Sequence, residues 1–299
     1  MGLGKEFAKQ GWYRLVRNPV GEALLYQGQR LAPAPWADPL FRRLAPQPSN
    51  YERGKLRMVE RYGLQFQLDP ADYFQWHHYY GFRDGVLTVL LELARGKRYI
   101  LDIGANIGLY ASCLAKAEPD AQVVAIEPHP STYARLERHQ SLNNLNNLRP
   151  LQRAIGAEPG ELELRDPGQG DSGKFTLRPG VDGGKSVKVR VLALPQLLQE
   201  LGWTQLDLVK IDVEGFEPEV FAGSVGSFLS LRPQLVFELS PNWYGARGEG
   251  LLRDLKVLEA AGYRATEVLD EHGQRGPCDL EAAIRRPQKR QYNVVLTPQ

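Results

Sequence analysis

Cysteine is scarce in this chain, and long hydrophobic runs are missing. The two cysteines, Cys113 and Cys278, lie far apart and beside no metal-ligand spacing, so we expect neither a disulfide framework nor a metal site built on cysteine. No apolar run approaches the roughly 18 residues that a membrane-spanning helix needs. The first residues also lack the apolar core and cleavage site of a signal peptide. These absences predict a cytoplasmic protein without a membrane span.

An excess of charge of either sign is missing as well. The 37 Lys and Arg residues nearly balance the 35 Asp and Glu residues, for a formal net charge of +2. Such a balance, without a basic stripe, gives no reason to expect a nucleic-acid partner, although it permits an anionic substrate. The length of 299 residues, 42% of them hydrophobic, suits one large α/β domain with an appended segment, or two small domains.

Residues 1–55 differ from the rest and are predicted to form an N-terminal extension. Five prolines between positions 33 and 48 prevent a long helix, although a short helix is expected near Glu22–Arg30. The segment is interpreted as an arm that covers the core or a second subunit, which allows a homo-oligomer. Its Trp and Arg residues also suit a contact with a substrate or partner, or a weak basic amphipathic contact with a membrane surface.

Residues 56–98 are predicted to lead into the main domain. Alternating side chains on either side of Tyr62-Gly63 indicate a β-hairpin. The aromatic cluster at positions 73–82 is expected to supply part of the core and part of a pocket wall. The apolar spacing of Asp84–Arg95 is typical of a helix.

From Tyr99 onward, strand-like and helix-like patterns alternate, which is typical of βαβ units and predicts an α/β domain over 99–299. The expected strands are Tyr99–Ile103, Gln122–Glu127, Leu148–Ile155, Glu161–Arg165, Val187–Val191, Leu206–Val213, Gln234–Leu239 and a final antiparallel pair, Tyr263–Leu269 with Gln291–Thr297. The expected helices include Leu109–Ala117, one from Ser131, Leu194–Leu201, one from Phe216, and Leu251–Ala261. A long Gly-, Asp- and Lys-rich loop over Pro167–Lys185 is expected to be mobile or functional.

The chain is organised around the stretch from Tyr99 to Tyr110, in which a buried strand runs into a glycine-bearing turn and a helix. Gly104 and Gly108 allow a sharp turn and a close approach of bound ligand. The turn lacks the G-x-G-x-x-G pattern of dinucleotide sites, because Asn106 occupies the second glycine position. Asp102 beside the turn suits a cationic ligand such as S-adenosylmethionine better than a pyrophosphate. A strand–helix turn with no ligand is the alternative.

Carboxylates follow several of the predicted core strands, and parallel strands place their ends on one edge of a sheet. Glu127 follows the glycine turn by about 20 residues, where an acidic residue typically accepts both ribose hydroxyls; a helix N-terminal charge is the alternative. Asp212 and Glu214 could orient a substrate, bind a divalent cation or act as a base, or form an ion pair at the rim with Lys210. Glu238 ends the next strand.

Several of these motifs together resemble the FkbM-type family of S-adenosylmethionine-dependent methyltransferases. They are the stretch from Asp102 to Gly108 with Tyr110, then Glu127-Pro128, then the segment Lys210–Glu217, then Phe237-Glu238, preceded by the Tyr62–Pro70 hairpin. The resemblance covers roughly residues 58–299. It implies a Rossmann-like class I methyltransferase fold, a seven-stranded, mostly parallel sheet with helices on both faces and the last strand antiparallel. It also implies O-methylation of a hydroxyl on a sugar, glycan or secondary metabolite.

The resemblance also implies roles for individual residues. Asp102 lies beneath the cofactor turn, and Asp212 and Glu214 face the transferred methyl group. Glu127 takes the ribose. Cofactor contacts carried over by position come from Gly104, Ala105, Asn106, Gly108, Tyr110, Pro128, Arg153, Ala154 and Asp212, with Gln152 near the adenine. Arg83-Asp84 replaces the Glu-Pro that the family usually has before its first helix.

The expected mechanism is a direct in-line displacement in which an acceptor oxygen attacks the methyl group. An alcohol is a poor nucleophile at neutral pH, so a base must take its proton, or a metal must lower its pKa. Asp212 is the first candidate for the base, followed by His129, Glu214 and Glu238. A divalent cation is compatible with the carboxylates, but no spacing indicates one. An NAD-dependent oxidoreductase and a non-catalytic, methyltransferase-like binding module are the competing hypotheses.

Overall fold

The computed structural model describes residues 11–31, 37–165, 176–177, 186–287 and 291–299. The chain forms two compact units, Met1–Arg83 and Asp84–Gln299. The division falls inside the predicted lead-in segment 56–98, because helix α5 (Gly85–Leu93) packs on elements of the second unit. Among the described residues, no helix combines the length and apolarity needed to cross a membrane.

The first unit contains helices and a hairpin. Strands β1 and β2 pair antiparallel, and the connecting residues Tyr62 and Gly63 have φ values of 56° and 68°, which is the left-handed backbone of a tight hairpin turn. The predicted hairpin and the predicted short helix, α2, are confirmed. Trp76, Tyr80 and Phe82 are buried, as expected for the part of the aromatic cluster that forms core. The elements of this unit are α2 (Pro19–Leu31), α3 (Ala37–Leu44), η1 (Pro48–Asn50), β1 (Arg57–Arg61), β2 (Leu64–Leu68) and α4 (Tyr73–Tyr79).

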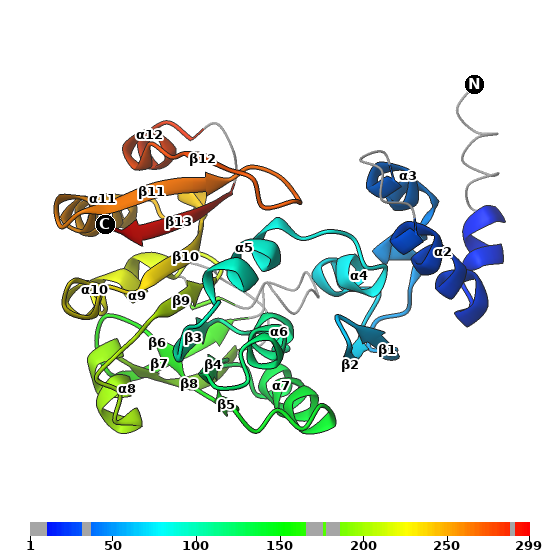
Figure 1. The fold of residues 1–299 in the computed structure, drawn as a ribbon, viewed down its shortest axis with the longest axis horizontal. Coiled ribbons are helices and arrows are strands. Elements are labelled where there is room, and N and C mark those ends of the chain that lie inside the picture. Colours follow the sequence, from blue (N-terminus) through cyan, green and yellow to red (C-terminus); the bar gives the residue numbers. More distant parts are fainter. Residues whose placement is uncertain (1–10, 32–36, 166–175, 178–185, 288–290) are drawn as a thin grey trace. The chain divides into compact units, whose positions relative to one another are not determined.

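The second unit is built on an eight-stranded sheet with the order β12-β11-β13-β10-β9-β3-β4-β5 (Figure 1). Strands β10, β9, β3, β4 and β5 are parallel, and β13 runs antiparallel to both of its neighbours. This is the predicted Rossmann-like arrangement. The strands are β3 (Tyr99–Ile103), β4 (Gln122–Ile126), β5 (Leu148–Leu151), β9 (Leu208–Ile211), β10 (Gln234–Leu239), β11 (Tyr263–Val268), β12 (Arg275–Pro277) and β13 (Tyr292–Pro298).

The eighth strand is an addition to the seven that were predicted. β12 has three residues and pairs with the outer edge of β11 through a turn closed by the bond from Leu269 N to Gln274 O. A strand this short has no readable alternation, so the sequence did not indicate it.

Helices cover both faces of the sheet (Figure 1). One layer consists of α5, α6 (Leu109–Ala117) and α7 (Pro130–Leu142). The opposite face packs against α8 (Leu194–Leu201), α9 (Glu217–Ala222), α10 (Val225–Leu231) and α11 (Arg247–Ala260), with η3 (Pro241–Trp243) and α12 (Leu280–Arg285) nearby. Leu101, Ile103, Val209 and Ile211 belong to the core on this second side. Because successive strand residues alternate between faces, Asp102 and Lys210 point toward the α5–α7 layer.

A separate three-stranded sheet, in the order β6-β8-β7, consists of β6 (Ala154–Ile155), β7 (Gly160–Arg165) and β8 (Ser186–Leu192). The prediction of one strand over Leu148–Ile155 is therefore wrong: β5 ends at Leu151, and β6 pairs with β8 instead of continuing the main sheet. The predicted strands near β7 and β8 are confirmed. The predicted loop over Pro167–Lys185 lies outside the described residues, apart from Thr176 and Leu177.

Candidate active site

Close packing within the protein explains why the turn between β3 and α6 contains two glycines. Gly104 and Gly108 have φ values of +78° and +79°, which L side chains rarely adopt. A Cβ atom on Gly104 would lie 1.8 Å from the carbonyl oxygen of Asp212, and one on Gly108 would lie 2.1 Å from Cδ1 of Leu136. The turn therefore presses directly against the end of β9, which brings Asp212 beside the predicted cofactor turn.

Glu127 joins the end of β4 to the same turn. Its Oε2 accepts a hydrogen bond from the backbone N–H of Asn106 at 2.9 Å, and its Oε1 accepts one from the N–H of His129 at 2.8 Å. Burial raises the pKa of Glu127 to about 7, although these two N–H donors oppose the shift. Each carboxylate oxygen can accept a second hydrogen bond. The remaining acceptor capacity fits the two adjacent hydroxyls of a ribose.

Three charged side chains, Asp102, Lys210 and Asp212, form what we call the ion triad. Asp102 on β3 is in register with Lys210 on β9. The Lys210 Nζ lies 3.3 Å from Oδ1 of Asp102 and 3.3 Å from Oδ2 of Asp212, and it donates to the Gly104 carbonyl at 3.2 Å. The side chains of Asp102 and Lys210 are 0% and 6% exposed, whereas that of Asp212 is 33% exposed. Asp212 is thus the member of the triad that a solute can reach.

The charges of the ion triad depend on one another. Burial raises the pKa of Asp102, and Lys210 offsets this only in part. Burial opposes the charge of Lys210, but Asp102 and Asp212 more than compensate and raise the pKa of Lys210 above its usual range. Lys210 is therefore a charged ammonium group held between two carboxylates.

Tyr110 and Asp84 extend the triad toward α5. The Lys210 Nζ lies 5.2 Å from the centre of the Tyr110 ring, within the range of a cation–π contact. The Tyr110 hydroxyl donates to Oδ2 of Asp84 at 2.6 Å, and Oδ1 of Asp84 caps α5 by accepting from Leu87 N at 3.0 Å. Asp84, which was not among the predicted site residues, thus fixes the ring of one of them.

The turn after β9 is held by the carboxylate of Glu217, which was not among the predicted site residues. Glu214 and Gly215 have positive φ values of 52° and 90°. The Oε1 atom of the fully buried Glu217 accepts from two backbone N–H groups of this turn, at 3.1 and 3.3 Å. From outside the turn, Arg247 Nη1 donates to the Gly215 carbonyl at 3.1 Å, and Thr176 Oγ1 donates to the Glu214 carbonyl at 2.8 Å.

Glu238 lies at the end of β10. Its Oε1 accepts hydrogen bonds from Ser240 Oγ and from Gln291 Nε2, both at 2.9 Å. Burial raises the pKa of Glu238 to about 8, with a further contribution from the charges of Asp212 and Glu217. Burial also raises the pKa of Glu217 to about 7. The carboxylates that follow β9, begin α9 and lie near the end of β10 therefore influence one another.

The raised pKa values of two buried glutamates and of the half-buried Glu238 predict that stability falls as pH rises. Glu127, Glu217 and Glu238 have folded-state pKa values of about 7, 7 and 8, against 4.5 for an unperturbed glutamate. Between these limits the folded chain binds protons that the unfolded chain has released, so the free energy of unfolding decreases with pH. Each group contributes up to about 1.4 kcal/mol per pH unit.

This pH dependence can be measured by thermal denaturation between pH 5 and pH 8.5. We expect Glu238→Gln to flatten the slope, whereas Glu→Gln at the exposed Glu161 should leave it unchanged. A wild-type midpoint that rises throughout this interval, or an equal slope in both variants, would contradict the burial argument.

The remaining predicted residues lie outside the ion triad. His129 is the N-cap of α7, and its Nδ1 lies 3.0 Å from Ser131 Oγ and 3.4 Å from Thr132 Oγ1. Arg153 Nη1 donates to the carbonyl oxygen of its neighbour Gln152 at 3.3 Å, and Ala154 is buried in the small sheet. The structure thus joins Asp102, Gly104, Tyr110 and Asp212 through Lys210, and it joins Asn106 to Glu127. The catalytic and cofactor-binding roles of all the predicted site residues stay predictions.

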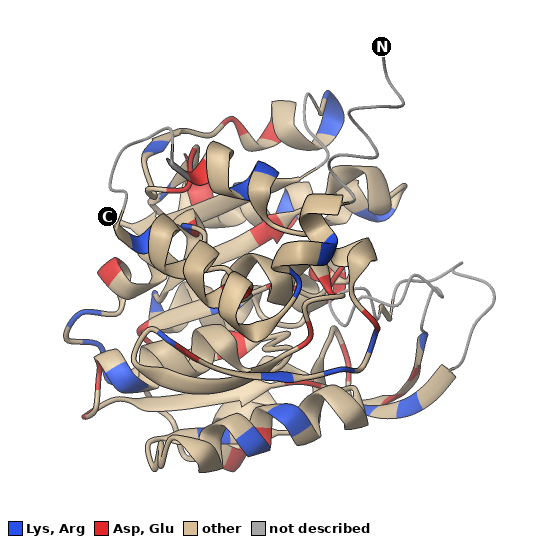
Figure 2. Ribbon diagram, turned by 90° about the vertical axis from the view of Figure 1, so that its right-hand side faces the viewer, with Lys and Arg blue, Asp and Glu red and all other residues tan. Residues whose placement is uncertain are grey.

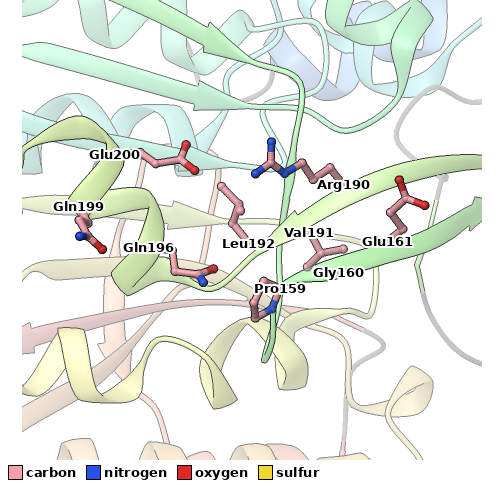
Figure 3. A pocket seen from close by; sticks show the side chains of 9 residues that line it. All are labelled: Pro159, Gly160, Glu161, Arg190, Val191, Leu192, Gln196, Gln199 and Glu200. Atoms are coloured by element: carbon pink, nitrogen blue, oxygen red, sulfur yellow. The ribbon is translucent and has the colours of Figure 1, made fainter.

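A hollow of about 480 Å³ opens between the small sheet and α8, and Figure 3 shows the side chains that line it. Its nine lining residues, which include Glu161, Arg190 and Glu200, contain none of the predicted site residues. Among the described residues, no group of three or more His, Cys, Asp or Glu side chains is placed to hold a metal ion.

Known proteins resemble this chain over the part that contains the ion triad and Glu127. The sequence model described as "Methyltransferase FkbM domain" matches residues 102–265, more than half of the chain. "Methyltransferase sdnD" of Sordaria araneosa is 30% identical over 186 residues, which cover 52% of this chain and 72% of that protein. The "hexuronic acid methyltransferase AglP" of Haloferax volcanii is 27% identical, with coverage of 49% and 58%.

One more relative and one crystal structure also resemble this chain. The "2-O-methyltransferase NoeI" of Sinorhizobium fredii is 30% identical over 140 residues, which cover 42% of this chain and 56% of that protein. The match to AglP and NoeI thus spans somewhat more than half of each. A crystal structure of "Methyltransferase FkbM" from Methylobacillus flagellatus aligns with a TM-score of 0.43 at 14% identity, covering 95% of this chain and 60% of that one.

The family match and the sdnD relative are decisive for the enzyme class, and they exclude the oxidoreductase hypothesis. The glycine turn, Glu127 and the Lys210–Asp212 segment all lie inside the matched region. The chain belongs to the FkbM family of S-adenosylmethionine-dependent methyltransferases.

Proposed function

We propose that this methyltransferase transfers a methyl group to a hydroxyl oxygen of a sugar or another small molecule, with Asp212 as the base. The observation that supports this role is the position of Asp212. It is partly exposed, it touches the cofactor turn through its backbone, and its carboxylate pairs with the buried Lys210. A base must be both reachable by the acceptor and adjacent to the group being transferred.

The residues of the turn fit the cofactor. Glu127 would accept the ribose hydroxyls, and the segment from Gly104 to Gly108 would lie against the rest of the molecule, as the family resemblance implies. Bound S-adenosylmethionine would supply a methyl group that its sulfonium has already activated. The protein's own task is then to bring the acceptor oxygen into line with that methyl group and to exclude water.

The proton of the acceptor hydroxyl would pass to Asp212 as the oxygen forms its bond to the methyl carbon and the carbon–sulfur bond breaks. Lys210 would position Asp212 for this step through the 3.3 Å contact between Nζ and Oδ2. Glu238 is the second candidate, because its pKa of about 8 suits a base that works in mildly alkaline solution. His129 and Glu214 are the remaining candidates.

The acceptor class is proposed from two relatives. AglP is named for a hexuronic acid and NoeI for a 2-O position, so we propose a sugar or glycan hydroxyl as the first class to test. Transfer of labelled methyl groups to a panel of monosaccharides, uronic acids and nucleotide sugars, with and without EDTA, tests the acceptor and the need for a divalent cation together. Transfer only to non-sugar hydroxyls would overturn the sugar assignment and leave the enzyme class intact.

The cofactor site can be tested without an acceptor. We expect S-adenosylhomocysteine to bind the wild type in calorimetric titration, and Glu127→Ala to weaken binding by about tenfold or more, since two hydrogen bonds to a charged group are lost. Glu127→Gln keeps the shape and should have a smaller effect, and Glu161→Gln on the exposed surface serves as the control. Unchanged affinity in Glu127→Ala would refute the ribose role.

A further inference from the structure

Helix α2 in the first unit has its polar and apolar sides reversed. Its buried residues are Glu22, Leu25 and Gln29, and the two polar members are hydrogen-bonded. Glu22 Oε2 accepts from the Tyr79 hydroxyl at 2.6 Å, and Gln29 Nε2 donates to Asp38 Oδ1 at 2.7 Å. The helix is therefore attached to its own unit largely through polar contacts.

The outward side of α2 is apolar instead. Val20, Leu24 and Leu31 are 69%, 68% and 77% exposed. At about 100° per residue, these three side chains fall within an arc of roughly 40°. In the short helical segment before α2, Leu15 is 72% exposed and Trp12 is 39% exposed. A run of large apolar side chains this exposed usually marks a surface that another body covers.

The exposed charged side chains near these apolar residues are all positive. Among the described residues from 11 to 50, the acidic side chains are Glu22 and Asp38, and both are only 2% exposed. The exposed charged side chains of the same stretch are all arginines: Arg14, Arg17, Arg30 and Arg43. In the chain as a whole, by contrast, acidic and basic residues are interspersed along the helices and strands (Figure 2).

We propose that this N-terminal surface, formed by Trp12, Leu15, Val20, Leu24 and Leu31 with Arg14 and Arg30, binds an anionic lipid bilayer. The leucines enter the boundary between headgroups and acyl chains, and the arginines meet the lipid phosphates. The 13-residue α2 lies along the interface and does not span it, because a span needs about 20 residues.

Charge argues for a bilayer and against a second copy of the chain. A two-fold dimer built on this surface would place the same patch on both partners and would gather the arginines of both copies at one interface. An anionic bilayer attracts each of them, by about 1 kcal/mol per basic residue near the surface. The surface requires neither the cofactor site nor an acceptor, so its test is independent of the proposed function.

Sedimentation of the full chain with vesicles tests the proposal. We expect binding to vesicles of equal parts phosphatidylcholine and phosphatidylglycerol, little binding to pure phosphatidylcholine, and weakening by salt. Leu24→Gln with Leu31→Gln should reduce the partition coefficient about tenfold or more. The control is Val257→Gln with Leu269→Gln, two apolar residues of the second unit that are 42% and 51% exposed; this variant should bind as the wild type does.

The arginines need a separate comparison. Arg14→Gln with Arg30→Gln should abolish the preference for anionic vesicles, while the exposed pair Arg149→Gln with Arg264→Gln should retain it. Thermal denaturation of each variant confirms that the fold persists. Absence of vesicle binding, equal binding by all variants, or a dimer in sedimentation equilibrium that Leu24→Gln with Leu31→Gln dissociates would each overturn the proposal.

Discussion

Lys210→Met is expected to lower the free energy of unfolding by about 3–5 kcal/mol, because it leaves a buried carboxylate without its counter-charge. Asp102 has no exposed surface, and the Lys210 Nζ at 3.3 Å is the cation that faces it. Methionine fills much of the volume of the lysine stem, so the loss reports on charge more than on packing. Chemical denaturation measures it, and Lys188→Met at an exposed position of β8 serves as the control.

The cost of Lys210→Met should grow with pH. Burial already raises the pKa of Asp102 in the wild type, and removing the ammonium raises it further. The folded variant then holds a proton that the unfolded chain has released, so its stability declines as pH rises above the unfolded pKa. We therefore expect a larger difference from the wild type at pH 8 than at pH 6.

A double variant isolates the charge effect. Lys210→Met with Asp102→Asn removes both buried charges and should recover much of the loss, because an amide is far cheaper to bury than an unpaired carboxylate. A Lys210→Met variant as stable as Lys188→Met, or a double variant less stable than Lys210→Met alone, would show that the ion triad does not hold the strand ends together.

Much of the main sheet could be predicted because burial on both faces leaves a simple pattern. β3, β4 and β9 are short apolar runs followed by turn residues, and in parallel strands covered by helices such runs are nearly continuous. The same rule failed at Leu148–Ile155. Ala154 and Ile155 are apolar again after two polar residues, but β5 is an edge strand that contains Pro150. The chain leaves it for the small sheet.

The site was predictable at the level of strand ends and less so for single side chains. Glu127 could be selected because a fixed distance separates it from the glycine turn. Lys210 was considered only as a rim partner, although a lysine inside the run Leu208–Ile211 signals a buried charge that requires a partner. The pairing of Lys210 with Asp102 across the sheet depends on strand register, which cannot be read from one sequence.

The segment after β9 shows a second limit to what can be predicted from the sequence. Asp212, Glu214 and Glu217 are three carboxylates within six residues, and the spacing alone does not say which one is exposed. The positive φ values at Glu214 and Gly215 turn the chain so that Glu217 is buried and accepts hydrogen bonds from the turn itself. Asp212 remains accessible. Such a turn is set by contacts from distant residues, among them Arg247.

Asp212→Asn is expected to reduce kcat by about 10²–10⁴-fold, the usual contribution of a positioned base. Asparagine preserves the size of the side chain and an oxygen that can face Lys210, but it cannot take a proton from the acceptor hydroxyl. Affinity for S-adenosylhomocysteine should change by only a few-fold, because Glu127 and the Gly104–Gly108 turn are untouched. Initial rates with an acceptor identified from the panel, together with calorimetry, separate these two quantities.

Variants of the other candidate bases provide the comparison that tests this prediction. Glu238→Gln, His129→Gln and Glu214→Gln remove the alternatives one at a time, and each should retain most of the kcat if Asp212 takes the proton. Glu238 already carries hydrogen bonds from Ser240 and Gln291, whereas the Asp212 carboxylate faces both Lys210 and the solvent-accessible rim. A fully active Asp212→Asn beside an inactive Glu238→Gln would transfer the role to Glu238. Loss of cofactor affinity in Asp212→Asn, with kcat preserved, would instead make Asp212 a residue that binds the cofactor.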